Sequence, residues 1–337
     1  MPFDDYWYVV AESRELTGSR VLARSVLDER LACFRGANGT PAVLRDRCLH
    51  RNAPLSKGVV RGGLLSCPYH GWTYDGTGRV VAIPSLDEKD LPAHCSPPYP
   101  VREQHGYVYV RVNRQAPEAI APFAMPHHGE PGWSSLRLQN RCANTVANCV
   151  ENFIDIPHTA FVHQRLFRAT RGERLAATVR RIDGNVHVEY RNERGNLGSY
   201  RWFLNPGQRE IRHTDSFHAP NVTSVVYEIG AKTFVITSQA VPVAERETLV
   251  YTDLTYRFGI WNALAAPFVR RHGQRIIGQD IEILARQGES IARYGAEFRD
   301  TPADVIHQMV DSIRAAIARG EDPRALPAVA HEIEFRL

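Results

Sequence analysis

The spacing of apolar and polar positions predicts a strand-rich first third of the chain. Short apolar runs separated by turn residues predict β-strands at residues 7–10, 31–34, 41–44 and 106–112. Asp75-Gly76 lies in a segment rich in turn residues and supplies the positive φ angles that tight hairpins need. We therefore expect an all-β module from Trp7 to about Arg114.

The remainder of the chain mixes helical and strand patterns. Residues 115–133 contain four prolines and predict a connection between domains. A helix is expected over 144–156, and two more over 261–293 and 302–319, with Gly320 as the stop of the last one. Period-2 alternation between these helices predicts antiparallel strands at 184–190, 222–229, 233–241 and 248–258. The expected fold class is α+β, with domains at residues 1–115 and 116–337.

Composition places the chain among ordinary globular proteins. It has 337 residues, of which 43% are hydrophobic and 23% charged, and its net charge of +4 gives no case for nucleic-acid binding. No apolar run reaches the length of a membrane span, and the first residues lack the pattern of a signal peptide. Six cysteines are too few for a disulfide scaffold. We expect a cytoplasmic protein in which Cys33, Cys95, Cys142 and Cys149 are free thiols.

The strongest chemical signal is a pair of mixed cysteine–histidine motifs. Cys48-x-His50 is followed, after sixteen residues, by Cys67-x2-His70. In a Rieske [2Fe-2S] centre two thiolates hold one iron and two imidazoles hold the other, so each loop would supply one ligand to each iron. Tetrahedral zinc is the alternative, although zinc sites usually keep like ligands together. The mixed pairs favour the iron–sulfur cluster.

A second group of polar residues runs through an apolar segment. Asn152, Asp155 and His158 are spaced i, i+3, i+6 and would share a broad face of a continuous helix. A straight helix would place His158 and His163 about 140° apart, at about 100° per residue. Both histidines can bind one ion only if the helix bends or ends between them, and Pro157 favours such a break. Two ordinary core or surface histidines are the alternative.

A carboxylate that could complete this site lies on a later helix. Asp280 falls on the apolar stripe of that helix, whereas Glu282 falls on its polar side. An unpaired buried carboxylate is costly, and binding to a metal ion is one way to compensate it. Two histidines and one carboxylate form the usual non-haem Fe(II) site. A salt-bridged structural acid is the alternative for Asp280.

These motifs together resemble the Rieske non-haem iron oxygenase α subunits over essentially the whole chain. The matching segments are Cys-Leu-His-Arg at 48–51, Cys-Pro-Tyr-His-Gly-Trp at 67–72, Asn-x2-Asp-x2-His-x4-His at 152–163, and an acid more than a hundred residues later. Chain length and residues 279–284 look most like the vanillate O-demethylase and dicamba monooxygenase branch. The resemblance implies an N-terminal all-β Rieske domain, a C-terminal helix-grip catalytic domain with an antiparallel sheet, and a homotrimer.

The resemblance also implies roles for individual residues. Cys48, His50, Cys67 and His70 would bind the [2Fe-2S] cluster, and His158, His163 and Asp280 would bind a mononuclear Fe(II). Asp155 would connect an iron-ligand histidine to a cluster histidine of a neighbouring subunit. Asn152 would lie near the open side of the iron, with a packing or capping amide as the alternative.

The implied activity is that of a terminal monooxygenase component. No G-x-G-x-x-G motif follows a predicted strand, so electrons from NAD(P)H would come from a separate ferredoxin- and flavin-containing reductase. One oxygen atom of O2 would enter a C–H bond of a small aromatic or heterocyclic substrate, and insertion into an O- or N-methyl group would release formaldehyde. Hydroxylation or ring dioxygenation at another carbon is the alternative. A Rieske electron-transfer or regulatory protein and a zinc-stabilised binding module are the rival classes.

Two groups of residues are candidates for substrate contacts. Arg165, Arg168, Arg171 and Arg174 form a basic segment that could attract an anionic substrate or an acidic ferredoxin, with a solvated surface loop as the alternative. Pocket-lining positions are expected on the strands that carry Trp202, His213, Phe217, His218 and Asn221.

Overall fold

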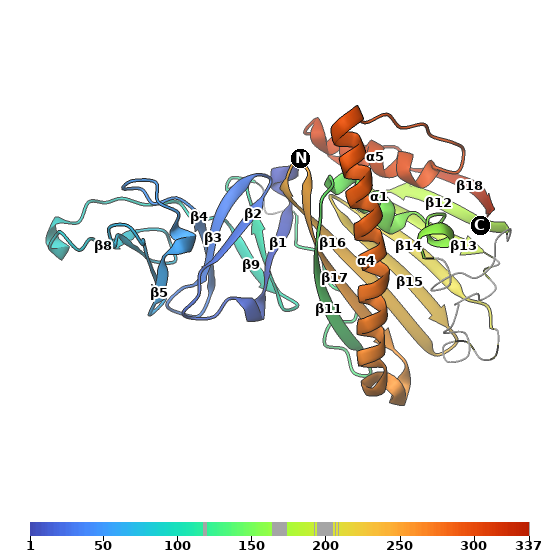
Figure 1. Ribbon diagram of the computed structural model, residues 1–337, viewed down its shortest axis with the longest axis horizontal. Helices are drawn as coiled ribbons and strands as arrows, with labels where there is room; N and C mark the ends of the chain where they lie inside the picture. The colour runs from blue at the N-terminus through green and yellow to red at the C-terminus, as the bar shows by residue number, and fades with distance from the viewer. Residues whose placement is uncertain are drawn as a thin grey trace. The chain divides into compact units, whose positions relative to one another are not determined.

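The computed structural model describes residues 1–116, 120–163, 174–191, 193, 205, 207 and 209–336. The described chain forms two compact units (Figure 1). The N-terminal unit comprises Asp4–Ala124 with Pro242–Glu245, and the C-terminal unit comprises Met1–Phe3, Met125–Val241 and Arg246–Leu337. The division after residue 115 that the sequence suggests stays a prediction.

The N-terminal unit is built from three small antiparallel sheets, which agrees with the all-β module predicted from the sequence. Their strand orders are β1-β10-β9, β2-β3-β4 and β5-β6-β7-β8. The strands are β1 (Trp7–Glu12), β2 (Leu22–Val26), β3 (Glu29–Arg35), β4 (Pro41–Arg45), β5 (Val59–Arg61), β6 (Leu64–Ser66), β7 (Thr73–Tyr74), β8 (Val80–Ala82), β9 (Val101–Gln104) and β10 (Tyr107–Arg111). Short 3-10 helices occur at Phe3–Asp5, Ser13–Glu15, Leu55–Lys57 and Glu88–Asp90.

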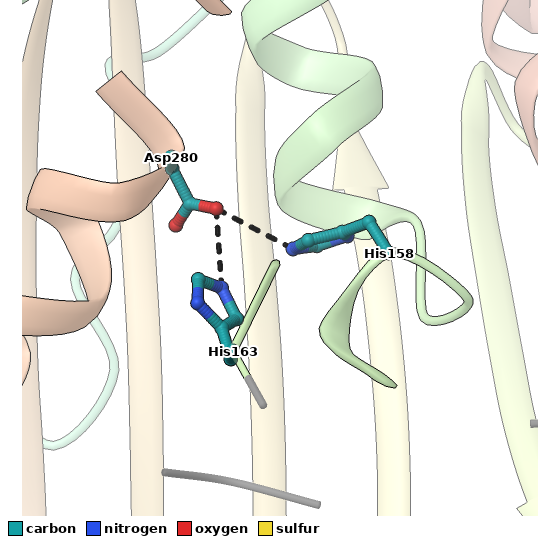
Figure 2. Close-up of side chains that lie close together, drawn as sticks. All are labelled: His158, His163 and Asp280. Carbon is teal, nitrogen blue, oxygen red and sulfur yellow. Dashed lines mark ion pairs between the residues drawn. The ribbon is translucent and has the colours of Figure 1, made fainter. Parts of the chain in front are cut away.

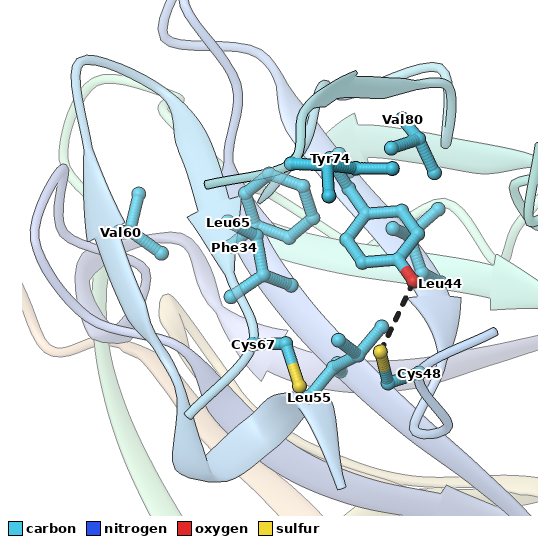
Figure 3. Close-up of a cluster of buried hydrophobic side chains, with 12 residues drawn as sticks. Phe34, Leu44, Cys48, Leu55, Val60, Leu65, Cys67, Tyr74 and Val80 are labelled. Carbon is cyan, nitrogen blue, oxygen red and sulfur yellow. Dashed lines mark hydrogen bonds between the residues drawn. The ribbon is translucent and has the colours of Figure 1, made fainter. Parts of the chain in front are cut away.

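A buried cluster formed by the β2-β3-β4 and β5-β6-β7-β8 sheets supports the two cysteine-containing loops (Figure 3). Phe34, Leu44, Leu65 and Tyr74 are fully buried within it. Cys48 and Cys67 belong to the same cluster, at 1% and 4% exposure. The apolar side chains therefore hold the base of each loop in place.

The C-terminal unit is one eight-stranded antiparallel sheet with helices packed on it, which confirms the predicted α+β class. The strand order is β11-β17-β16-β15-β14-β13-β12-β18. The strands are β11 (Ser134–Cys142), β12 (Arg174–Ile182), β13 (Asn185–Arg191), β14 (Arg212–His218), β15 (Val222–Ile229), β16 (Lys232–Ala244), β17 (Glu247–Arg257) and β18 (Val329–Arg336). The helices are α1 (Val146–Ile154), α2 (Thr159–Val162), α4 (Asn262–Tyr294) and α5 (Val305–Ala318), with 3-10 turns at Gly259–Trp261 and Pro323–Ala325.

The long helix α4 crosses the sheet and contacts β11 and β17 (Figure 1). Within the described part of the chain, no helix combines the length and apolar character needed to cross a membrane. Burial along α4 is confined to Ala265, Val269, Asp280, Leu284 and Gly288. One narrow face of the helix therefore packs inward, and Asp280 lies on it.

One local expectation is wrong, and an edge strand was missed. The helix predicted over 144–156 ends at Ile154, and Asp155 has an extended backbone with φ −82° and ψ 113°. Asn152, Asp155 and His158 therefore do not share one helical face. Edge strand β18 was not expected from its sequence, because Phe335 is its one fully buried side chain and the remaining positions are exposed or half-buried.

Candidate metal centres

The two cysteine-containing loops of the N-terminal unit share one backbone hydrogen-bond pattern. Cys48 N–H donates to the carbonyl five residues later at 2.8 Å, and Asn52 N–H donates back to the Cys48 carbonyl at 3.0 Å. Cys67 and Gly71 repeat both bonds at 2.8 and 3.1 Å. Asn52 and Gly71 also share a positive φ, 61° and 69°. The two motifs therefore fold into equivalent turns, each presenting one thiol and one imidazole.

The four side chains of these turns fit a two-thiolate, two-imidazole cluster. The rings of His50 and His70 meet edge to face, with centroids 4.6 Å apart. His50 Nδ1 is buried and has no hydrogen-bond partner among the described residues. The His50 ring also stacks on Trp72 at 4.9 Å and 6° between planes. A buried nitrogen without a hydrogen bond, on a ring held in one orientation, is what a metal ligand requires.

Tyr74 contacts the first loop from inside the hydrophobic cluster (Figure 3). Its hydroxyl oxygen lies 3.3 Å from Cys48 Sγ and accepts a hydrogen bond from Leu49 N–H at 3.0 Å. Burial raises the pKa of Tyr74 well above its usual range, so the phenol stays protonated. It is therefore positioned to donate its one hydrogen to the sulfur.

In the C-terminal unit, His158, His163 and Asp280 converge (Figure 2). His158 precedes the short helix α2 and His163 follows it, while Asp280 comes from α4. Nε2 of His163 lies 3.1 Å from Asp280 Oδ1, and Nε2 of His158 lies 3.5 Å from the same oxygen. The helix break at Pro157 thus provides the change of direction that two histidine ligands of one ion need.

A second contact on each histidine fixes which nitrogen faces the site. His158 Nδ1 donates to the carbonyl oxygen of Asp155, and His163 Nδ1 donates to Gln279 Oε1 at 3.0 Å. With Nδ1 carrying the hydrogen, each neutral ring presents the lone pair of Nε2 toward Asp280. This is the arrangement in which outer hydrogen bonds orient metal-binding histidines.

The electrostatics of the three side chains also fit a cation. Asp280 is buried, and its Oδ1 accepts no hydrogen bond of normal geometry from a described residue. Burial raises the pKa of Asp280, but the adjacent imidazoles of His158 and His163 lower it by more, so the net shift is downward. Burial lowers the pKa of His158, but Asp155 and Asp280 together raise it to about 9. The site therefore favours positive charge, which a proton or a metal ion can supply.

Asp155 and Asn152 lie at the edge of the same site. The Asp155 side chain is 40% exposed, and its Oδ2 accepts a hydrogen bond from the backbone N–H of His158 at 3.2 Å. Asn152 lines the cavity described next, and its Oδ1 is buried without a hydrogen-bond partner in the described part of the chain. Glu282, the alternative acid, is exposed and forms an ion pair with Arg286 instead.

A cavity of about 190 Å³ opens beside the three side chains. Its walls are mostly apolar and include Phe234, Phe258, Phe268, Ile236 and Ile276. Of the predicted pocket residues, His213 lines the cavity, whereas Phe217, His218 and Asn221 are not among its described lining residues. Trp202 and Arg165, Arg168 and Arg171 lie outside the described residues.

The fold and these two sites define the class of Rieske non-haem iron oxygenases. Comparison with known proteins agrees: residues 6–100 match the Rieske [2Fe-2S] domain, and residues 144–319 match the vanillate O-demethylase oxygenase C-terminal domain. The chain belongs to this vanillate O-demethylase oxygenase family and carries a Rieske [2Fe-2S] domain.

Two similar curated proteins are named as oxygenase components or subunits. The chain is 31% identical to the oxygenase component of dicamba O-demethylase of Stenotrophomonas maltophilia over 185 residues, 54% of each chain. It is 32% identical to the vanillate O-demethylase oxygenase subunit of Pseudomonas sp. (strain HR199 / DSM 7063) over 161 residues, 47% of this chain and 44% of the relative. The match thus spans about half the length of these two relatives, and less than a third of some others.

Solved structures show the same fold across nearly the whole chain. The crystal structure of dicamba monooxygenase bound to dicamba superposes with a TM-score of 0.82 at 20% identity, covering 94% of this chain and 98% of the other. At this level of identity the likeness concerns the fold.

Proposed function

We propose that the protein is the terminal oxygenase component of a multicomponent Rieske monooxygenase. It would insert one oxygen atom of O2 into a C–H bond of a small aromatic or heterocyclic substrate, in an O- or N-demethylation. The observation that carries this proposal is the convergence of both histidine Nε2 atoms on Asp280 Oδ1 in the wall of an apolar cavity. Family membership and the second set of ligands, in the N-terminal unit, support it.

The proposal assigns a ligand role to seven residues. Cys48, His50, Cys67 and His70 hold the [2Fe-2S] cluster, and His158, His163 and Asp280 hold mononuclear Fe(II). When bound, these groups supply one-electron transfer and activation of O2. The boundary near residue 115 would separate the two functions.

The remaining residues orient the ligands and shape the cavity. The Asp155 carbonyl and Gln279 hold the two imidazoles in the tautomer that presents Nε2. The partly exposed Asp155 carboxylate would also contact a cluster histidine of a neighbouring subunit in a homotrimer. Asn152 presents a buried amide oxygen at the cavity wall, where it can accept a hydrogen bond from substrate or water. The apolar walls exclude bulk water from the reacting C–H bond.

The overall reaction is R–H + O2 + 2 e⁻ + 2 H⁺ → R–OH + H2O. If R–H is a methyl group on oxygen or nitrogen, the product loses formaldehyde. The electrons would come from NAD(P)H through a separate reductase with ferredoxin and flavin chemistry. A cytoplasmic location is part of the proposal, and the free thiols at Cys33, Cys95, Cys142 and Cys149 support a reducing compartment.

Metal analysis of anaerobically purified protein tests the proposal. We expect about three irons and two acid-labile sulfides per chain, from one [2Fe-2S] cluster and one mononuclear site. His163→Ala is expected to lose one iron and keep the sulfide and the visible spectrum. His272→Ala is the matched control, because His272 lines the same cavity but lies outside the three-residue site.

Other results would favour the rival classes. Two irons per chain that Fe(II) addition does not raise would contradict the oxygenase and favour an electron-transfer protein. Bound zinc in a colourless protein would contradict both assignments. Formaldehyde released during turnover with a reductase separates demethylation from hydroxylation or dioxygenation at another carbon.

A further inference from the structure

A buried charged network lies in the cavity wall, separate from the three convergent side chains. His213 Nδ1 contacts Glu193 Oε2 at 2.8 Å, and His213 Nε2 contacts Asp215 Oδ1 at 2.9 Å. The Tyr190 hydroxyl donates to the other oxygen of Asp215 at 3.0 Å. Both His213 and Asp215 line the cavity.

Strand register explains how the network forms. Tyr190 on β13 pairs with His213 on β14, which pairs with Tyr227 on β15. The His213 ring lies between the two phenol rings, at 4.4 Å from Tyr190 and 4.2 Å from Tyr227, with 25° between planes in both pairs. His213 is 1% exposed. This packing holds the imidazole in one orientation between its two carboxylate partners.

Asp215 is out of place among its neighbours on the sheet. It pairs with Val225 on β15, and Val225 pairs with Ile236 on β16, so a carboxylate continues a row of aliphatic side chains. All three residues line the cavity. A buried carboxylate beside apolar side chains is strongly disfavoured unless it is paired. Asp215 has two such partners, the imidazole of His213 and the phenol of Tyr190.

Among the described residues, these partners do not occupy all of the hydrogen-bond acceptor positions of the Asp215 carboxylate. Each oxygen of an ionised carboxylate has about two acceptor positions, and His213 and Tyr190 each occupy one. His213, in contrast, has both of its ring nitrogens engaged. The network thus offers acceptors to the cavity. It contains two carboxylates and one imidazole, so it is negative even when the imidazole is protonated.

We propose that Asp215 is a specificity-determining residue that accepts a hydrogen bond from an N–H or O–H group of the substrate. The inference rests on the proposed function and narrows its substrate class to small ring compounds with a neutral or cationic hydrogen-bond donor. A cavity of about 150 Å³ is known to hold benzene, so about 190 Å³ admits one substituted ring. A carboxylate facing Asp215 would be repelled.

Lys232, a lysine among the described lining residues, makes the opposite substrate preference testable. Lys232 begins β16 and pairs with Ile229, four residues along β15 from the Val225 that neighbours Asp215. Both Lys232 and Ile229 line the cavity. If Lys232 held an anionic substrate, the protein would bind a ring compound with a carboxylate more tightly than the same ring with a hydrogen-bond donor.

Binding of four matched probes to the metal-loaded protein tests the proposal without turnover. The probes are 4-methoxybenzylamine, 4-methoxyphenol, anisole and 4-methoxybenzoate, measured by isothermal titration calorimetry. We expect the amine and the phenol to bind about tenfold tighter than anisole, which has no donor, and the benzoate to bind weakest. Equal affinity for anisole and both donors, or tightest binding of the benzoate, would overturn the proposal.

Asp215→Asn tests the residue itself. This variant is expected to lose most of the preference for the amine over anisole, while anisole binds as in the wild type. Asp253→Asn is the matched control, since Asp253 is also buried and ion-paired, with Arg137, but is not among the described lining residues. An unchanged preference in folded Asp215→Asn would refute the assignment.

The wild-type probe ranking decides the matter even if Asp215→Asn does not fold. The probe ranking measures ligand binding, whereas iron content measures metal loading and formaldehyde release measures turnover. A failure of the oxygenase proposal is therefore visible separately from a failure of this one.

Discussion

Replacing Tyr74 by Phe should lower the reduction potential of the cluster. The Tyr74 hydroxyl already accepts a hydrogen bond from Leu49 N–H, so its single hydrogen is available to Cys48 Sγ at 3.3 Å. A hydrogen bond to a ligand sulfur stabilises the reduced cluster more than the oxidised one, because reduction adds negative charge to the cluster. Phenylalanine removes that bond and keeps the ring in the buried cluster.

The size of the shift follows from the strength of such a bond. A hydrogen bond to a charged group contributes about 1.5–3 kcal/mol. Taking about 1.4 kcal/mol as the difference between the two redox states gives about 60 mV for a one-electron couple. The expected shift in Tyr74→Phe is therefore about −60 mV.

A potentiometric titration followed by circular dichroism measures this potential directly. Tyr109→Phe is the matched control, because Tyr109 is equally buried in the N-terminal unit but lies in the β1-β10-β9 sheet, outside the cluster that contains Cys48. Iron and sulfide content should be unchanged in both variants. A Tyr74→Phe potential within about 10 mV of the wild type would refute the hydrogen-bond argument.

Two further predictions concern stability. Gly63→Ala should reduce the free energy of unfolding by more than about 3 kcal/mol in urea, because Gly63 has φ +77° and an added Cβ would lie 2.0 Å from the backbone nitrogen of Ala37. Gly62→Ala, with φ +58° and open space around it, should lose about 1 kcal/mol, and equal losses would contradict the steric reason. Burial lowers the pKa of His213, but its two carboxylate partners raise it to about 9. The wild type should therefore have a larger free energy of unfolding than His213→Gln, by up to about 3 kcal/mol. This difference should be fully present below pH 6.5 and should be lost as the pH rises through 9. A difference that grows with pH would contradict the prediction.

The cysteine and histidine motifs could be recognised from sequence because their geometry is local. In each loop the cysteine and the histidine are two or three residues apart, and one turn with a positive φ at Asn52 or Gly71 presents both. Asp280 could be predicted from the sequence for a different reason. An acid on the apolar stripe of a helix departs from the hydrophobic pattern, and a carboxylate buried in this way needs a charged, hydrogen-bonding or metal partner.

Other features depended on contacts that no local pattern contains. Gln279 orients His163 across 116 positions of the sequence, and nothing about a glutamine on the polar side of a helix indicates that contact. The alternation His213-x-Asp215 places both residues on one face of a strand, which could have suggested a buried pair. The cavity that they line, and the stacking of Tyr190 and Tyr227 on His213, could be predicted only from the order of the strands in the sheet.

The position of Asp280 relative to the histidines depends on a buried residue outside both motifs. Asn144, 2% exposed, precedes α1 and donates from Nδ2 to the Leu284 carbonyl of α4 at 2.8 Å. Its own carbonyl accepts from the Thr248 hydroxyl of β17 at 2.9 Å, so one residue ties the start of α1 to α4 and the sheet.

A glycine on α4 makes that close approach feasible. A Cβ at Gly288 would lie 2.3 Å from the carbonyl oxygen of Ala143, the residue before Asn144. α4 can therefore lie against the start of α1 only with glycine at this position. Asp280 lies two turns before Gly288 on α4, while His158 and His163 follow the end of α1. The spacing of the three convergent side chains is thus set by the packing of Asn144 and Gly288, which are not ligands, as much as by the motif that contains the histidines.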